Sequence, residues 1–402
     1  MILKSVLEEV TKSQAENLKR FNYGIDRELL DKVTFRSNFA LIVSGIRRSG
    51  KSTLAMQAAR KLNKFYYFNF EDPRVKGMDA QDLVKLDDVL KEVFGEADHY
   101  LFDEIQNVHD WETFVRSRLD AGKQFIITGS NASLLSRELG TKLTGRNLIY
   151  ELFPFSFKEF LEFKKLTPSL HSFNEYLTEG GFPEYLKFGD SAILTTLLND
   201  IISRDILARY KIRNEQVLTR MAIYMLSSIG REFTYNGLRK LFGLGATNTA
   251  ISFVSYLEYT YLIFTVPKFD YSLRKQINNP KKVYSIDNGL TLANSISNAE
   301  DKGRLLENAA FLGLRRNHKD IFYFKRKKEC DFLVKEKNKI VSAIQVCYKV
   351  SDENKERELG GLEEAMAEFS LNSGTILTND QEDELILNGR KISIVPLWKW
   401  LL

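Results

Sequence analysis

The chain has 402 residues, of which 44% are hydrophobic and 28% charged, with a formal net charge of +5 at pH 7. Its length predicts about two or three globular domains, and its mildly basic charge permits contact with nucleic acid. A charged N-terminal segment excludes a signal peptide, the lack of a run of about 18 apolar residues excludes a membrane span, and two cysteines exclude a disulfide framework, so we expect a cytoplasmic protein.

Five short apolar runs in the first part of the chain predict the strands of a parallel sheet, with helices between them. The runs are 39–44, 64–70, 99–103, 124–128 and 147–152. Pro154 ends this pattern, and residues 156–210 have mostly helical periodicity. We therefore expect an α/β P-loop core over residues 1–155 and a helical lid over residues 156–212.

Residues 213–290 have the element order of a winged helix. Apolar residues at helical spacing predict a first helix that Gly230 ends. Two further helical segments, 235–242 and 246–259, precede a strand pair around a polar, basic loop. Residues 300–402 have the pattern of a helix, three strands, a helix and a strand, which predicts a separate α/β domain.

A phosphate-binding motif follows the first predicted strand. Residues 45–52, Gly-Ile-Arg-Arg-Ser-Gly-Lys-Ser, fit GxxxxGK[ST] between a strand and a helix, which is the context that the motif requires. Lys51 is expected to reach the β- and γ-phosphates of ATP, and the Ser52 hydroxyl to hold Mg²⁺. The predicted nucleotide-binding residues of this segment are Gly45, Ile46, Arg47, Arg48, Ser49, Gly50, Lys51, Ser52 and Thr53.

Two acids follow the third predicted strand. Asp103 is expected to hold Mg²⁺ and Glu104 to polarise the attacking water, the alternative being a strand end that is merely acidic. After the fourth strand, either Ser130 or Asn131 senses the γ-phosphate, or the segment is a simple turn. Arg146 precedes the fifth strand, where it is either a surface residue or an arginine finger that acts on a neighbouring subunit of a homo-oligomer.

These motifs resemble those of the AAA+-type P-loop ATPases, and more closely the archaeal ATPase group related to the STAND ATPases. Residues 143–146 and 153–160 are similar to the consensus of that group, and so is the segment Gly180-Gly-Phe-Pro183. The resemblance implies a P-loop domain, a helical lid and a winged helix, with Pro183 near the adenine of ATP. It also implies a C-terminal domain similar to the PD-(D/E)XK nucleases.

The nuclease pattern fits the last domain only in part. It needs an acid on the first helix, an acid on a strand, and Glu-x-Lys on the next strand, so that carboxylates hold Mg²⁺ and a lysine stabilises hydroxide. Glu307 and Asp331 match the two acids, but Gln345 and Cys347 stand where Glu and Lys are expected. Lys349 is a candidate substitute, because a residue two positions on shares the strand face. The domain either has a second metal site or is an inactive fold kept for binding.

Basic residues suggest a nucleic-acid partner. Residues 315–339 contain ten Lys or Arg against four acids, which predicts either a phosphate-binding patch or a solvated surface. The third helix of the winged helix, 246–260, has no Lys or Arg, whereas the loop after it is basic. The winged helix therefore either binds DNA weakly or docks onto the ATPase.

Taken together, the motifs predict a switch that binds ATP and Mg²⁺, hydrolyses the ATP, and engages DNA without sequence preference or engages a protein partner. The alternative is an ATP-gated DNA nuclease. A third hypothesis, in which ATP is only a structural ligand, is disfavoured by the intact pair Asp103 and Glu104.

Overall fold

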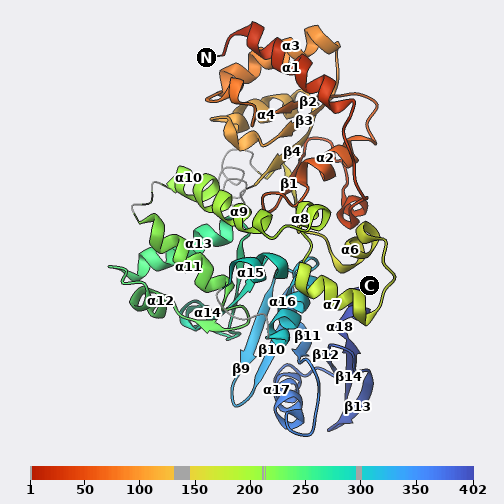
Figure 1. Ribbon diagram of the computed structural model, residues 1–402, viewed down its shortest axis with the longest axis vertical. Helices are drawn as coiled ribbons and strands as arrows, with labels where there is room; N and C mark the ends of the chain where they lie inside the picture. Colours follow the sequence, from red (N-terminus) through yellow and green to blue (C-terminus); the bar gives the residue numbers. More distant parts are fainter. Residues whose placement is uncertain (1, 131–144, 211, 213, 296–300) are drawn as a thin grey trace. The chain divides into compact units, whose positions relative to one another are not determined.

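A computed structural model describes residues 2–130, 145–210, 212, 214–295 and 301–402 (Figure 1). The chain divides into two compact units, Met1–Leu152 and Phe153–Leu402. Within the described ranges, every helix is too short or too polar to span a bilayer.

The first unit contains a five-stranded parallel sheet with the strand order β2-β3-β4-β1-β5 (Figure 1). The strands are β1 (Ala40–Ser44), β2 (Phe65–Asn69), β3 (His99–Asp103), β4 (Gln124–Gly129) and β5 (Asn147–Glu151). The helices are α1 (Lys4–Leu18), η1 (Glu28–Lys32), α2 (Lys51–Ala59), η2 (Pro73–Val75), α3 (Ala80–Phe94), η3 (Ile105–Asn107) and α4 (Trp111–Asp120). The predicted parallel sheet is thus confirmed, and each predicted strand is correct to within one residue at either end.

Helices cover both faces of this sheet, which explains why its central strands are apolar throughout. Ala40 and Ile42 of β1 belong to the core that α1, α3 and α4 form on one face. The alternating residues Leu41 and Val43 belong to the core that α2 forms on the other face. Because all strands run in parallel, the loops that follow β1, β3 and β4 meet at one edge of the sheet.

The first helix protects the open edge of the sheet. Among the described residues β2 is an end strand, so its outer backbone groups have no neighbouring strand there. The buried side chain of Gln14 on α1 fills this position: its Nε2 donates to the carbonyl of Asn69 at 3.0 Å, and its Oε1 accepts from the Asn69 N–H at 2.8 Å. A side-chain amide therefore makes the two hydrogen bonds that a sixth strand would make at Asn69.

The second unit begins with helices and a small antiparallel sheet. The first helices are α6 (Phe157–Lys164), α7 (Leu170–Glu179), α8 (Pro183–Phe188), α9 (Ala192–Asp200), η4 (Ile201–Leu207) and α10 (Ala208–Tyr210). Next come α11 (Glu215–Leu226), β6 (Glu232–Phe233), α12 (Tyr235–Leu241), α13 (Thr247–Tyr259), β7 (Ile263–Pro267), α14 (Leu273–Asn278), β8 (Lys281–Ser285) and α15 (Asn288–Asn294). The three strands have the order β6-β8-β7. The loop between β7 and β8, predicted to be polar and basic, contains the short helix α14.

A six-stranded mixed sheet completes the second unit, in the order β13-β14-β12-β11-β10-β9. Its elements are α16 (Lys302–Arg315), β9 (Ile321–Lys325), β10 (Glu329–Glu336), β11 (Lys339–Val346), α17 (Lys355–Glu368), β12 (Ser373–Thr378), β13 (Asp383–Leu387), β14 (Arg390–Pro396) and α18 (Leu397–Trp400). The predicted element order holds as far as β12. The hairpin β13-β14 was missed, because exposed polar residues interrupt the apolar pattern of β13.

Candidate functional site

The P-loop leaves β1 at Ser44 and enters α2 at Lys51. Gly45 has φ 152°, and a Cβ atom there would lie 2.1 Å from the carbonyl oxygen of Leu152, because the chain continues beside β1 after β5. Gly50 has φ 95° and opens the helix from a left-handed conformation. Both glycines are therefore required by the backbone path that brings the loop to the start of α2.

Lys51 is buried within the loop that precedes it. Its Nζ donates to the carbonyl of Ile46 at 3.0 Å and lies 3.8 Å from Oε1 of Glu104. The predicted phosphate-binding lysine is thus beside the acid that is predicted to polarise water.

Asp103 is held by hydroxyl groups. Its Oδ1 accepts hydrogen bonds from Oγ of Ser52 at 2.9 Å and from Oγ1 of Thr128, and its Oδ2 accepts a long one from the Tyr67 hydroxyl at 3.5 Å. Burial, with the charge of Glu104 second, raises the pKa of Asp103 to about 6. Among the described residues Asp103 has no ion-pair partner, so its charge remains available to a cation.

Glu104 occupies a left-handed backbone conformation, with φ 55° and ψ 43°. A non-glycine residue in this region costs about 1–3 kcal/mol and needs support from its surroundings. Its N–H donates to Oγ1 of Thr128 at 2.9 Å, and its Oε2 accepts from Nε2 of Gln106. The Thr128 hydroxyl thus contacts both acids, since it accepts from one and donates to the other. Sequence reasoning missed Thr128, although a polar residue at the end of an apolar strand was a usable signal.

Arg27 is a second residue that sequence reasoning missed. Its buried guanidinium donates from Nη1 to the carbonyl of Ser49 at 2.8 Å, and a Cβ atom at Gly50 would lie 3.2 Å from that nitrogen. Gln57 of α2 donates to the carbonyl of Ile25 at 2.6 Å. The segment before β1 is therefore fastened to the P-loop. A single arginine in a polar stretch gave no sequence signal, because only the folded chain reveals its burial.

Two buried serine hydroxyls at this edge of the sheet are without a partner in the part of the chain that the structure describes. They are Oγ of Ser49, within the P-loop, and Oγ of Ser130, directly after β4. Buried hydroxyls are normally hydrogen-bonded, so both can serve the polar atoms of a ligand. Asn131, the other predicted sensor, lies outside the described residues.

The remaining P-loop arginines differ in their surroundings. Arg47 Nη1 lies 3.2 Å from Oε1 of Glu71. Arg48 has a left-handed backbone with φ 62°. Arg47 thus contacts an acid in this structure, and its predicted contact with phosphate stays a prediction.

Arg146 lies at the opposite edge of the sheet from the P-loop. The N–H of Ala40, the first residue of β1, donates to the carbonyl of Arg146 at 3.1 Å. The P-loop leaves the other end of this strand, about 16 Å away at about 3.3 Å per residue. Arg146 therefore does not reach the P-loop of its own chain. Its side chain is 41% exposed and pairs with Asp120, and its role in a neighbouring subunit stays a prediction.

The segment from Gly180 to Pro183 packs within the second unit. Pro183 is the first residue of α8, a position that suits proline. The N–H of Gly181 donates to Oδ2 of Asp287 at 2.6 Å, and a Cβ atom at Gly180 would lie 2.2 Å from Oδ1 of Asp287. The glycines therefore make room for a buried carboxylate that also caps α15. The predicted place of Pro183 beside adenine stays a prediction.

Glu307 and Asp331 come together around a lysine of β8. Nζ of Lys282 lies 3.1 Å from Oε1 of Glu307, 2.8 Å from Oδ1 of Asp331 and 2.7 Å from Oε1 of Glu329. The hydroxyl of Tyr284 also donates to Glu307, at 2.6 Å. The Lys282 side chain is only 3% exposed. An ammonium group therefore lies among the carboxylates that the nuclease pattern assigns to Mg²⁺.

Gln345, the predicted neutral ligand, is also engaged within the protein. Its Oε1 accepts from the N–H of Asp331 at 3.2 Å, and its Nε2 donates to Glu358 at 2.8 Å. The other carboxylate oxygen of Asp331 accepts from the N–H of Val346 at 3.0 Å. The hydrogen bonds of this group thus tie β10, β11 and α17 together.

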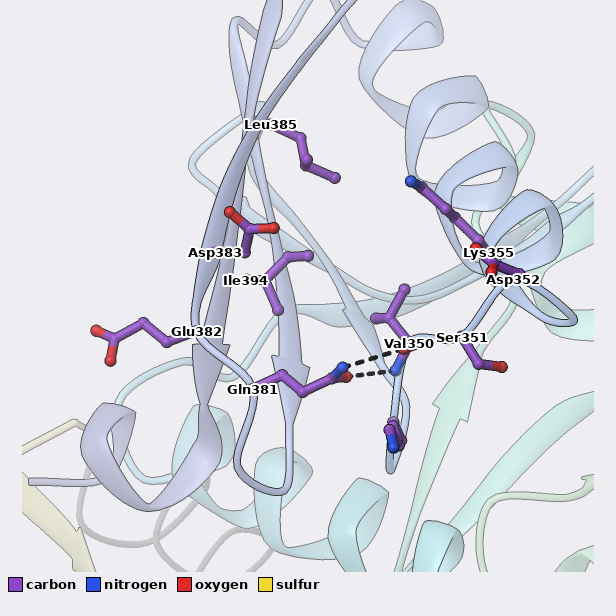
Figure 2. A pocket seen from close by; sticks show the side chains of 10 residues that line it. Val350, Ser351, Asp352, Lys355, Gln381, Glu382, Asp383, Leu385 and Ile394 are labelled. Atoms are coloured by element: carbon purple, nitrogen blue, oxygen red, sulfur yellow. Dashed lines mark hydrogen bonds between the residues drawn. The ribbon is translucent and has the colours of Figure 1, made fainter.

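The prediction that Lys349 shares a strand face with Gln345 is wrong, because β11 ends at Val346 and the chain turns away. Lys349 instead lines a pocket of about 530 Å³ beside the start of α17. Figure 2 shows Lys355 and Leu385 on opposite sides of this pocket. Neither Glu307 nor Asp331 lines it. Lys349 is therefore not a substitute for the missing nuclease lysine in this structure.

Five of the ten basic residues in the segment 315–339 make the following contacts within the second unit. Three of its cations form ion pairs: Lys325 with Glu232 and Glu329, Arg326 with Glu368, and Lys328 with Glu356. Arg315 and Arg316 lie over the ring of Phe153. The free positive charge of this segment is therefore smaller than its composition indicates.

Comparisons with known proteins agree with the geometry of the first unit. Residues 37–161 match the AAA domain family, and residues 170–301 match a domain of unknown function, DUF8612. The structure of the replication initiator DnaA bound to AMPPCP and single-stranded DNA aligns with 57% of this chain and 85% of its own, at 13% identity and a TM-score of 0.29.

Two curated relatives match most of the chain. An uncharacterized protein of Haemophilus influenzae is 29% identical over 345 residues, which cover 80% of this chain and 86% of the relative. The uncharacterized protein MJ1544 of Methanocaldococcus jannaschii is 36% identical over 437 residues, which cover 100% of this chain and 96% of the relative. The chain therefore belongs to the family of MJ1544, and it carries an AAA-type P-loop domain at residues 37–161.

Proposed function

We propose that this protein hydrolyses ATP with Mg²⁺ in its first unit and that the nucleotide state switches how its second unit engages DNA. One observation carries the ATPase: Lys51, Ser52, Asp103 and Glu104 converge at one edge of a parallel sheet. This convergence supports both a phosphate site and a metal site, because the lysine and the P-loop glycines adjoin oxygen ligands of the kind that Mg²⁺ prefers.

Each residue of the site has a separate role in binding the metal, binding phosphate or activating water. Ser52 and Asp103 would hold the metal, since a hydroxyl and a carboxylate oxygen already lie 2.9 Å apart. When bound, Mg²⁺ neutralises charge on the β- and γ-phosphate oxygens. Lys51 exchanges its contact with the Ile46 carbonyl for a phosphate oxygen. Glu104, fixed at its backbone by Thr128, orients and deprotonates the attacking water.

The second unit supports the DNA part of the proposal. Its residues 213–290 form helix, strand, helix, helix and hairpin, with the strand order β6-β8-β7, which we interpret as a winged helix. The preceding helices, within residues 156–212, serve as the lid. Because α13 carries no Lys or Arg, the contact is expected to be with phosphates through the β7–β8 loop and therefore to be non-specific.

An ATP-gated nuclease is not proposed. The carboxylates that such an activity needs for metal binding already surround Lys282. Residues 300–402 instead fit a nuclease-like fold whose acids have become an internal ion-pair cluster. Its strand β9 is hydrogen-bonded through Tyr323 to both ends of the β7–β8 loop.

Two variants test the ATPase. Glu104→Gln keeps the shape of the side chain but removes the base, so ATP should stay bound while turnover falls by about 10²–10⁴-fold. Lys51→Ala should weaken binding itself. Lys61→Ala, an exposed lysine near the end of the same helix, is the matched control and should behave like the wild type.

Nucleotide binding and phosphate release should be measured for all these proteins, with and without duplex DNA. Wild-type turnover in both Lys51→Ala and Glu104→Gln would refute the assignment. If the protein binds DNA but its ATP turnover is the same with and without DNA, the proposed coupling between the two is refuted, whereas the ATPase assignment stands.

A further inference from the structure

The loop between β7 and β8 presents apolar side chains to solvent. Six large apolar side chains of the described residues are at least 60% exposed, and three of them lie in this loop: Tyr271 at 74%, Leu273 at 70% and Ile277 at 60%. Leu273 and Ile277 are four residues apart in α14 and therefore lie on the same face. Burying such a side chain stabilises a protein by about 1.5–3 kcal/mol. Leu273 and Ile277 lie on one face of α14, and neither contributes this stabilisation to the folded second unit.

The loop is rigidly supported at both ends by one buried residue of β9. The N–H of Phe269 donates to the carbonyl of Tyr323 at 2.8 Å, and the Tyr323 hydroxyl donates to the carbonyl of Pro280 at 2.9 Å. The ring of Phe269 packs against Phe322 and Phe369, with centroids 5.6 and 4.9 Å away. The two ends of the loop are therefore anchored on β9, while Leu273 and Ile277 between them remain exposed.

Basic residues lie close in sequence to the apolar pair. Residues 268–280 contain Lys268, Arg274 and Lys275 against the single acid Asp270. Lys275 lies 3.9 Å from that acid, whereas Arg274 is exposed and forms no ion pair within the described ranges. The surface that complements this loop is therefore anionic and has an apolar slot for two side chains.

We infer that residues 268–280 form a wedge that inserts Leu273 and Ile277 between stacked base pairs of duplex DNA and bends the duplex. Apolar side chains that unstack a base step kink DNA by about 20–90°, and phosphates on either side supply the negative charge. An anionic membrane fits less well, because interfacial helices bury a long apolar face, and α14 has only six residues. The inference rests on the proposed function, namely that the second unit engages DNA.

The experiment measures binding and bending separately on the same duplexes. Labels at the two ends report bending by energy transfer, 2-aminopurine in the duplex reports unstacking, and anisotropy reports affinity. The variant Leu273→Ala/Ile277→Ala should bind within a few-fold of the wild type but lose the bend and the 2-aminopurine signal. The control Ile386→Ala, which removes a 79% exposed side chain from β13, should keep both.

A second variant separates the effect of the apolar side chains from the effect of the positive charge. Arg274→Ala/Lys275→Ala should weaken binding to every duplex and reduce the slope of log K against log salt by about 0.9–1.8, at about 0.9 per phosphate contact, because Lys275 is already near Asp270. An unchanged bend in Leu273→Ala/Ile277→Ala, with DNA still bound, would overturn the wedge alone. Failure of the wild type to bind any duplex at low salt would overturn both the wedge and the DNA part of the proposed function. Loop-dependent binding to phosphatidylserine vesicles in place of DNA would make the loop a membrane contact.

Discussion

Each unit of the molecule buries acids beside a lysine, but the two groups are bonded differently. In the first unit, hydroxyl groups contact Asp103, while Lys51 lies 3.8 Å from Glu104. In the second unit, Lys282 contacts three carboxylates at 2.7 to 3.1 Å. A carboxylate held by hydroxyls keeps its charge for an incoming cation, whereas one held by an ammonium group is already neutralised. Acids at the right spacing thus indicate a metal site only when no side-chain cation lies between them.

The largest expected effect concerns a third cation, Arg146, whose ion pair is exposed. An exposed pair is worth about 0–1 kcal/mol, so Asp120 can release the arginine to a neighbouring subunit. If Arg146 acts there, Arg146→Ala should lower turnover by about 10³–10⁵-fold. Mixing it with Lys51→Ala subunits should restore activity at shared interfaces, and turnover per subunit should rise with concentration. No rescue and concentration-independent turnover would leave Arg146 a surface residue.

The second prediction breaks the buried cluster. Lys282→Met leaves the buried carboxylates of Glu307 and Asp331 without their cation, so the free energy of unfolding should fall by about 3–5 kcal/mol, as measured by denaturant titration. The combined variant Lys282→Met/Glu307→Gln/Asp331→Asn should recover most of the loss. Wild-type stability in the single variant would show that the cluster is not the ion-pair group described above.

The third prediction concerns the buried carboxylate of Asp103, which has no ion-pair partner among the described residues. Burial raises the pKa of Asp103 from 3.8 to about 6, so its ionised form destabilises the folded state above that pH. Asp103→Asn should therefore abolish Mg²⁺-dependent turnover and yet raise the free energy of unfolding by about 1–3 kcal/mol at pH 8.

The sign of this effect fixes its pH dependence. Protonation of Asp103 stabilises the wild type fully below its ordinary pKa of 3.8, and this stabilisation is lost as pH rises through about 6. The gap between variant and wild type should open over this range and stay constant above it. Thermal unfolding from pH 4 to pH 8 measures it, and a variant less stable than the wild type at pH 8 would contradict the expectation.

The smallest effect is expected at the β9–β10 turn. Removing four unpaired cations that each contact a phosphate would reduce the slope of log K against log salt by about 3.6 for DNA binding. Replacing Lys325, Arg326, Lys327 and Lys328 by Ala should change it by less, equally on two unrelated duplexes, because three of the four are ion-paired. A change near the full value would mean that these ion pairs open when DNA binds.

Much of the first unit was predictable from sequence, for a local reason. Its strands are continuous apolar runs, and the residues from Gly45 to Ser52 and the pair Asp103-Glu104 each lie within one short segment. Thr128 and Arg27 were missed, because their roles depend on neighbours 24 and 22 residues away.

In the second unit the decisive contacts are more distant in sequence. Lys282 follows the basic loop between β7 and β8, and its side chain contacts Asp331, which is 49 residues away. That contact depends on how β8 packs against β10, and no local pattern encodes it. Lys349 was misplaced because the alternation of side chains holds only while the strand continues, and β11 ends three residues earlier.

The hydrogen bonds of the Gln14 amide affect the tendency of this protein to self-associate at high concentration. An uncovered end strand is a template on which another molecule can add its own strand, and repeated addition leads to polymerisation. Gln14 occupies the two backbone groups of Asn69 that such a strand would use, and Leu7 and Val10 of α1 pack into the core on one face of the sheet. The helix α1 therefore blocks strand addition at Asn69, and removing this helix would free the backbone groups of Asn69 for pairing with a strand of another molecule.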